Sequence, residues 1–180
     1  MPGMAALARE HFGAATPLNI RRSAAQALSE VSAGTAGAAL LPMPADGETD
    51  AAAWWTALLH KDDPRMHVVA RLPFWAPRAE GTPTAQGLVV CAAAPDPSGH
   101  DRALLGLELP AEVSRARLMT LMTGAGFVPG PTILRRRDPV MQALVEVDGF
   151  VADNDPRLAT LPTLRPPVVV GAYAVPLGVA

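Results

Sequence analysis

The order of predicted elements in residues 102–175 constrains the fold of this chain more than any other feature. A helix is predicted at 114–123, because Leu118, Leu121 and Met122 share one helical face and glycines follow. Asp155 and Pro156 are typical of a helix N-terminus and predict a short second helix. Four further segments alternate or are apolar throughout and predict strands, at 102–109, 131–135, 141–150 and 167–175.

The resulting order is strand, helix, strand, strand, helix, strand. It folds most simply into a four-stranded sheet with both helices on one face, the ferredoxin-like arrangement. The N-terminal half predicts a smaller α/β layer, with helices at 4–12, 24–33 and 51–59 and strands at 36–43 and 66–74.

The predicted fold class is therefore α+β, in two units. Residues 75–84 are rich in proline and glycine and predict a linker. The expected boundary separates 1–84 from 85–180. We expect residues 85–93 to form a strand that ties the two halves together.

The composition argues against several functional classes. A formal net charge of −2 gives no broad positive surface for nucleic acid, and the arginines at 135–137 are more typical of a solvated hairpin end. No apolar run approaches the roughly 20 residues that span a bilayer. The single cysteine, Cys91, lies in an apolar strand and indicates a buried thiol in a reducing compartment. We expect a cytoplasmic protein without membrane or nucleic-acid partners.

The sequence contains no recognised catalytic or metal motif. Phosphate-binding glycine loops, the HExxH zinc motif and the Gly-x-Ser-x-Gly nucleophile turn are all missing. His60 and His67 flank one strand without a further ligand at metal spacing. Trp54 and Trp55 could stack on a ligand ring, but the leucines at the next turn favour a core or interface position. We therefore expect no metal, no cofactor and no catalytic residue.

Four segments resemble the prephenate dehydratase family and occur in the family's order. They are 31–44 (VSAGTAGAALLPMP), 67–74 (HVVARLPF), 141–150 (MQALVEVDGF) and 168–176 (VVVGAYAVP). The first two are similar to the family's G-V-x-P-I-E-N-S segment and to the strand after it. The last two are similar to strands of its C-terminal ACT domain. The resemblance extends to the C-terminal region of proteobacterial chorismate mutase and prephenate dehydratase-like proteins.

The resemblance implies a partial periplasmic-binding-protein-like α/β lobe, followed by an ACT-type ferredoxin-like domain that assembles as a homodimer. The chain departs from the family where the family carries its chemistry. Pro44-Ala45-Asp46 replaces Glu-Asn-Ser, and Gln86-Gly87-Leu88 replaces the catalytic Thr-Arg-Phe. The expected protein is thus a non-catalytic regulatory or dimerisation module of the chorismate-to-phenylalanine route.

Two alternatives stay open. One is a chorismate mutase or prephenate dehydratase-type enzyme that acts on chorismate or prephenate with unrecognised or upstream catalytic residues. The other is a stand-alone ACT protein that senses amino acids.

The resemblance also implies a site for an aromatic amino-acid effector. A helix N-terminus at Ser114 suits a carboxylate, and Arg135 is what remains of the family's Glu-Ser-Arg-Pro motif. Against binding, the family's Pro-Gly-Ala-Leu is here Pro-Ala-Glu-Val at 110–113, which adds a negative charge beside the carboxylate. The residues expected at this site are Glu112, Val113, Ser114, Ile133 and Arg135.

Overall fold

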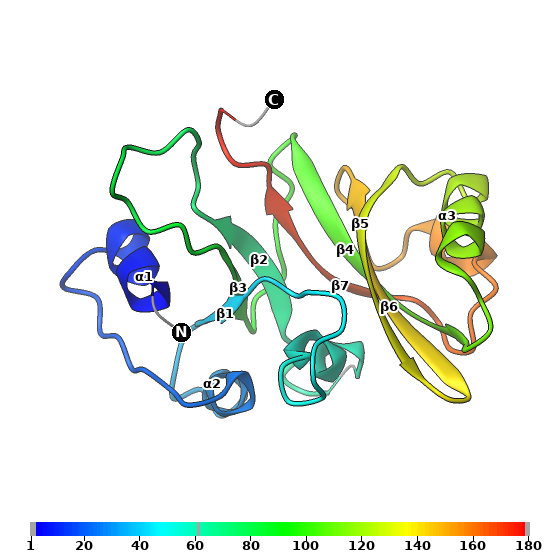
Figure 1. Ribbon diagram of the computed structural model, residues 1–180, viewed down its shortest axis with the longest axis horizontal. Helices are drawn as coiled ribbons and strands as arrows, with labels where there is room; N and C mark the ends of the chain where they lie inside the picture. The colour runs from blue at the N-terminus through cyan, green and yellow to red at the C-terminus, as the bar shows by residue number, and fades with distance from the viewer. Residues whose placement is uncertain (1–2, 61, 179–180) are drawn as a thin grey trace.

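The centre of the molecule is one mixed sheet of seven strands. A computed structural model describes residues 3–60 and 62–178 and orders the strands β1-β3-β2-β7-β4-β6-β5 (Figure 1). Neighbouring strands run antiparallel, except that β2 and β7 are parallel. The strands are β1 (Ala39–Pro42), β2 (His67–Leu72), β3 (Gly87–Cys91), β4 (Asp101–Pro110), β5 (Pro129–Arg137), β6 (Val140–Asp148) and β7 (Val168–Ala174).

Side-chain caps fix where three of the helical segments begin. Ser23 and Ser114 each accept a hydrogen bond from a backbone amide in the first turn, and so does Asp155. These caps satisfy amides that have no partner inside the helix. The segments are the α-helices α1 (Met4–Phe12), α2 (Ala24–Ser32) and α3 (Arg115–Gly124) and the 3-10 helices η1 (Trp54–Leu59) and η2 (Pro156–Thr160).

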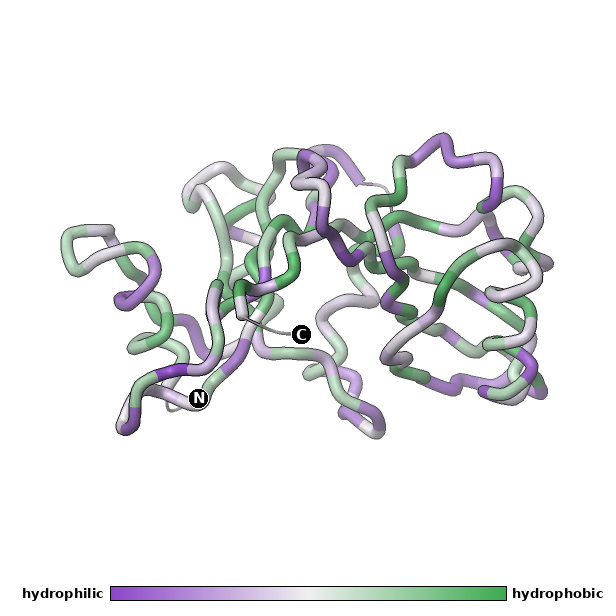
Figure 2. The backbone as a smooth tube through the Cα atoms, turned by 90° about the horizontal axis from the view of Figure 1, so that it is seen from above, coloured by the Kyte–Doolittle hydropathy of each residue, from purple (hydrophilic) through white to green (hydrophobic). Residues whose placement is uncertain are grey.

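Alternation along the central strands places a hydrophobic core on each face of the sheet. On one face, Leu105 and Val145 pack with Leu118 and Met122 of α3 and with Leu158 of η2. The opposite core contains Leu104, Leu144 and Val170 with α2, and with Trp54 and Trp55 of η1. The helical segments therefore lie on both sides of the strands (Figure 1). Figure 2 shows hydrophobic residues concentrated along the interior of the fold, while several of the outer loops are hydrophilic.

Strand β7 joins the N-terminal and C-terminal strands. It pairs with β4 on one side and with β2 on the other, where Val68 lies opposite Gly171. The expectation that 85–93 makes this junction is wrong, because β3 pairs with β1 and β2 and so lies within the N-terminal strands. The division of the chain at residue 84 stays a prediction.

The structure confirms the mixed α/β class and the approximate positions of the strands, and it corrects two local predictions. The helix predicted at 51–59 is a 3-10 helix that starts at Trp54, because the amides of Ala52 and Ala53 bond the Thr49 carbonyl in a preceding turn. Cys91, expected to be buried, is half-buried at the end of β3.

Candidate functional site

Strand β5 lies at an edge of the sheet, and a loop covers that edge. We call this loop, residues 44–52 between β1 and η1, the strap. Asp46 of the strap accepts a hydrogen bond from the Leu134 amide at 2.9 Å and pairs with Arg115 at 2.6 Å. The Arg115 guanidinium also donates to the carbonyl oxygen of Thr132. Side chains therefore bond backbone groups on the side of β5 where the described residues form no neighbouring strand.

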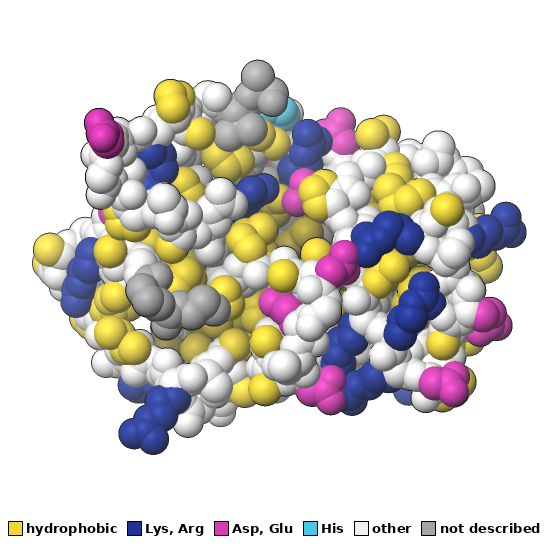
Figure 3. Space-filling view, viewed as in Figure 1, with side chains coloured by type: hydrophobic (Ala, Val, Ile, Leu, Met, Phe, Trp, Pro, Cys, Tyr) yellow, Lys and Arg dark blue, Asp and Glu magenta, His cyan; other side chains and the backbone are white. Residues whose placement is uncertain are grey.

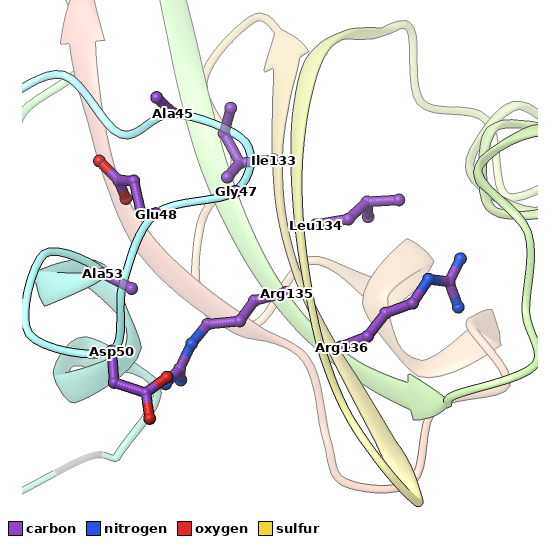
Figure 4. Close-up of a pocket in the computed structure, with 9 residues that line it drawn as sticks. All are labelled: Ala45, Gly47, Glu48, Asp50, Ala53, Ile133, Leu134, Arg135 and Arg136. Atoms are coloured by element: carbon purple, nitrogen blue, oxygen red, sulfur yellow. The ribbon is translucent and has the colours of Figure 1, made fainter.

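The arginines of β5 are separated because alternate side chains of a strand point to opposite faces. Arg135 and Arg137 lie toward the strap, where each donates to one carboxylate oxygen of Asp50. Arg136 points the other way and donates to carbonyl oxygens of the loop before α3 (Figure 4). The Arg135 side chain is only 12% exposed, whereas that of Asp50 is 69% exposed. The Arg135 guanidinium is therefore largely buried against the sheet, whereas the carboxylate of Asp50 lies at the surface.

An open groove of about 500 Å³ runs beside Arg135 and Arg137. We call it the arginine groove. Within it, Glu108 accepts a hydrogen bond from Gln142 at 3.2 Å and pairs with Arg165 at 3.4 Å. A smaller pocket of about 200 Å³ lies under the strap and shares Arg135 (Figure 4). The lining of the groove comprises Thr56, Ala57, His60, Glu108, Arg135, Arg137, Val140, Gln142, Leu164 and Arg165.

Positive charge outweighs negative charge in the described lining of the groove. Three guanidinium groups face one carboxylate, that of Glu108. Figure 3 shows basic and acidic side chains interleaved on the side of the molecule where β5 and β6 lie. Guanidinium groups bind carboxylates through paired, charge-assisted hydrogen bonds. Because Val140 and Leu164 add apolar contact surface, the groove suits a small carboxylate with an apolar part.

Glu48 places a carboxylate under the strap. Its Oε2 atom is out of contact with solvent and has no hydrogen-bond partner among the described residues. Burial raises the pKa of the Glu48 carboxyl, and a backbone hydrogen bond from Ala45 opposes this in part. Burying this carboxylate therefore destabilises the conformation in which the strap covers the pocket.

The five residues expected to bind an effector are divided between the two faces of the sheet. Ser114 caps α3, Val113 packs against the core on that face, and Glu112 is exposed beside it. Ile133 packs against the opposite core, and Arg135 lines the groove. Residues 112–114 lie together on one face, and Ile133 and Arg135 lie together on the other. The two groups do not form a single site within one chain. Effector binding by these residues stays a prediction.

The segment that replaces the family's Thr-Arg-Phe is structural. Gly87 begins β3 opposite Pro42 and Leu72, and Leu88 is 1% exposed within the core. Gln86 accepts a hydrogen bond from Arg71 at 3.1 Å.

A polar cluster lies next to this segment. Tyr173, which is 2% exposed, donates to Glu146, and the Arg71 guanidinium lies 3.4 Å from the Tyr173 hydroxyl. Arg102 pairs with Glu146 at 3.9 Å. Burial and the hydrogen bond to Glu146 raise the pKa of Tyr173 well above its ordinary value. The phenol therefore keeps its proton at alkaline pH values at which an exposed tyrosine ionises.

Sequence reasoning missed Asp46, Asp50 and Arg137 as members of the site. The acidic loop at 46–50 and the basic run at 135–137 were both visible. Their opposite charges were the one signal that the two segments meet. Among the described residues, no cluster of three metal-ligating side chains occurs, and no helix is long and apolar enough to cross a membrane.

The chain is a mixed α/β protein built on one curled seven-stranded sheet, and solved structures share this fold. A prephenate dehydratase from Arthrobacter aurescens, in complex with L-Phe, is 16% identical with a TM-score of 0.66, over 100% of this chain and 91% of that one. The quorum quenching acylase GqqA gives the same identity and TM-score, over 97% and 92%. The prephenate dehydratase from Streptococcus mutans is 13% identical with a TM-score of 0.60, over 91% and 87%.

The fold of this chain is therefore prephenate dehydratase-like. No family model matches the sequence, and no curated protein does.

Proposed function

We propose that this protein is a non-catalytic regulatory module of aromatic amino-acid metabolism that binds a small carboxylate in the arginine groove. The observation that carries the proposal is the convergence of Arg135 and Arg137 on a single carboxylate, that of Asp50. A ligand that presents a carboxylate and an apolar group, such as phenylalanine, matches both the guanidinium groups and the apolar lining. Arg135 was expected at an effector site, and its low exposure supports that role.

The proposal includes an ACT-type domain within residues 85–180 and a homodimer. In support, β7, β4, β6 and β5 form four adjacent antiparallel strands, with α3 and η2 against one face. This is the arrangement that the strand, helix, strand, strand, helix, strand order favours. Light scattering at tens of micromolar tests the dimer, and a monomer would overturn that part.

Calorimetry with phenylalanine at millimolar concentration tests the binding function. We expect saturable binding to the wild-type protein and its loss in Arg135→Gln. Arg117→Gln, which removes an exposed arginine of α3, serves as the matched control and should bind as the wild type does. Binding that survives Arg135→Gln would place the ligand elsewhere and overturn the assignment of the groove.

An assay of prephenate turnover tests the proposal that the protein has no catalytic activity. General acid–base groups contribute about 10²–10⁴-fold to such reactions, so their loss is easily measured. The positions of the family's motif hold Gln86, Gly87 and Leu88, none of which titrates as an acid or base. We expect no heat-sensitive phenylpyruvate formation above the uncatalysed background.

An enzyme acting on chorismate or prephenate is the second candidate, and the polar cluster favours it. Tyr173, Glu146 and Arg71 combine a buried hydroxyl, a carboxylate and a cation. Turnover that disappears in Tyr173→Phe, while the variant stays folded, would establish this candidate in place of the first.

A further inference from the structure

Two carboxylates of the strap bond arginine side chains and a backbone amide at the β5 edge of the sheet. Without the strap, these groups could bond a ligand or another strand. Asp50 occupies Arg135 and Arg137, one oxygen for each guanidinium. Asp46 occupies the Leu134 amide and Arg115. The first of these contacts has the form of a bound carboxylate ligand, supplied by the chain itself.

We propose that the strap is a latch and that Asp50 acts as an internal ligand, which an external carboxylate displaces from Arg135 and Arg137. This inference rests on the proposed function of the groove and adds its regulation. A carboxylate that binds the two arginines must first remove Asp50, because one set of guanidinium N–H groups cannot serve both partners at full strength. Ligand binding and closure of the strap are then mutually exclusive, and each weakens the other by the same factor.

The strap is built so that it can move without disturbing the core. Its side chains are exposed, apart from the half-buried Pro44 and Glu48. Both of its ends are fixed, because the Trp54 indole donates to the Pro42 carbonyl oxygen at 3.0 Å. Between these anchors, Gly47 turns the backbone at a φ of 74°, which favours glycine. Opening breaks ion pairs whose carboxylates, those of Asp46 and Asp50, are 53% and 69% exposed, so solvent replaces part of each contact.

Glu48 lowers the stability of the closed latch. Its Oε2 atom lacks both solvent and a hydrogen-bond partner among the described residues, and burial raises the pKa of the carboxyl. Opening would return this group to water. The contacts of Asp46 and Asp50 keep the strap closed despite the unfavourable burial of Glu48. Because the exposure of Glu48 favours opening, a competing carboxylate needs to replace only some of these contacts.

The test compares Asp50→Asn with Asp138→Asn on the full chain, with L-phenylalanine as the probe. Asp138 lies exposed in the turn between β5 and β6, so its substitution changes the net charge equally but leaves the latch intact. We expect phenylalanine to bind Asp50→Asn about tenfold more tightly than the wild type, which corresponds to about 1.4 kcal/mol. Asp138→Asn should bind as the wild type does. Equal or weaker binding by Asp50→Asn would overturn the proposal.

Hydrogen exchange supplies a second readout that needs no ligand. In Asp50→Asn, the Leu134 amide should exchange several times faster than in the wild type, since the strap that holds Asp46 over it is released. Phenylalanine added to the wild type should have the same effect. Unchanged exchange in ligand-free Asp50→Asn would show that Asp50 does not hold the strap. Absence of phenylalanine binding to both proteins would instead overturn the proposed function, while the ligand-free exchange rates would still decide the role of Asp50.

Discussion

Gly171 of β7 lies directly against the backbone of Val68 on β2. The two residues form the register pair at which parallel pairing joins the N-terminal and C-terminal strands. A β-carbon at position 171 would lie 2.5 Å from the Val68 amide nitrogen and would also overlap its carbonyl group. The junction between the two halves of the sheet therefore depends on the absence of a side chain.

Gly171→Ala should destabilise the protein by about 1–3 kcal/mol, the range for overpacking a well-packed site. The added methyl group must push β2 away from β7, and urea denaturation measures the loss. Gly124→Ala provides the control, because no atom in the described part of the chain lies within 4 Å of a β-carbon at that position at the end of α3. That variant should gain about 0.5–1 kcal/mol. Wild-type stability of Gly171→Ala would contradict the close approach of the two strands.

The absorbance of Tyr173 should titrate only when the protein unfolds. The chain contains one tyrosine, so the phenolate signal near 295 nm reports this residue alone. Its folded-state pKa is raised above the ordinary value, so the folded state retains the proton longer than the unfolded state. The resulting stabilisation is complete below about pH 10 and is lost as pH rises toward the folded-state pKa.

Tyr173→Phe serves as the reference for this titration. Its free energy of unfolding should fall less steeply above about pH 10 than that of the wild type. At neutral pH the substitution should cost about 1–3 kcal/mol, because Glu146 loses a buried donor. A phenolate signal that rises near pH 10 in the folded protein would show that Tyr173 is not sequestered as described.

Arg136→Gln should loosen the loop that precedes α3. The arginine donates to the carbonyl oxygens of Ala111 and Val113, and both hydrogen bonds are lost in the variant. We expect faster hydrogen exchange of the amides at 111–113 and a loss of about 0.5–1.5 kcal/mol in stability. The exposed Arg117 offers a control of the same charge. If Arg117→Gln speeds exchange of this loop equally, the effect is one of charge and not of these contacts.

Brief digestion with chymotrypsin should cut between β2 and β3 before it cuts within β2. Phe74 and Trp75 are 38% and 42% exposed, whereas Leu72 is fully buried. We expect the two fragments to elute together on gel filtration, because β3 pairs with β1 and β2 across the cut. Early cleavage at Leu72 would count against the division of the chain near residue 84, and separation of the fragments would count against the continuous sheet.

The sequence by itself determined the positions of most helices and strands. Patterns of apolar residues located α3 and the strands β4–β7, and Ser114 and Asp155 marked where two helical segments begin. These signals are readable because they depend on residues two to four positions apart. The prediction at 51–59 had the right location but the wrong start, because the amides of Ala52 and Ala53 bond the Thr49 carbonyl in a turn that precedes Trp54.

Only the tertiary structure decided which elements meet and which side chains form the candidate site. Asp50 and Arg135 are 85 positions apart, and no local pattern links them. Whether Arg135 and Arg136 face the groove or α3 follows from the register of β5 against β6, which a shift of one residue would reverse. The β2–β7 junction likewise depends on two backbones coming close enough to exclude a side chain. Such contacts are fixed by packing of the whole chain, so they become visible only in the folded molecule.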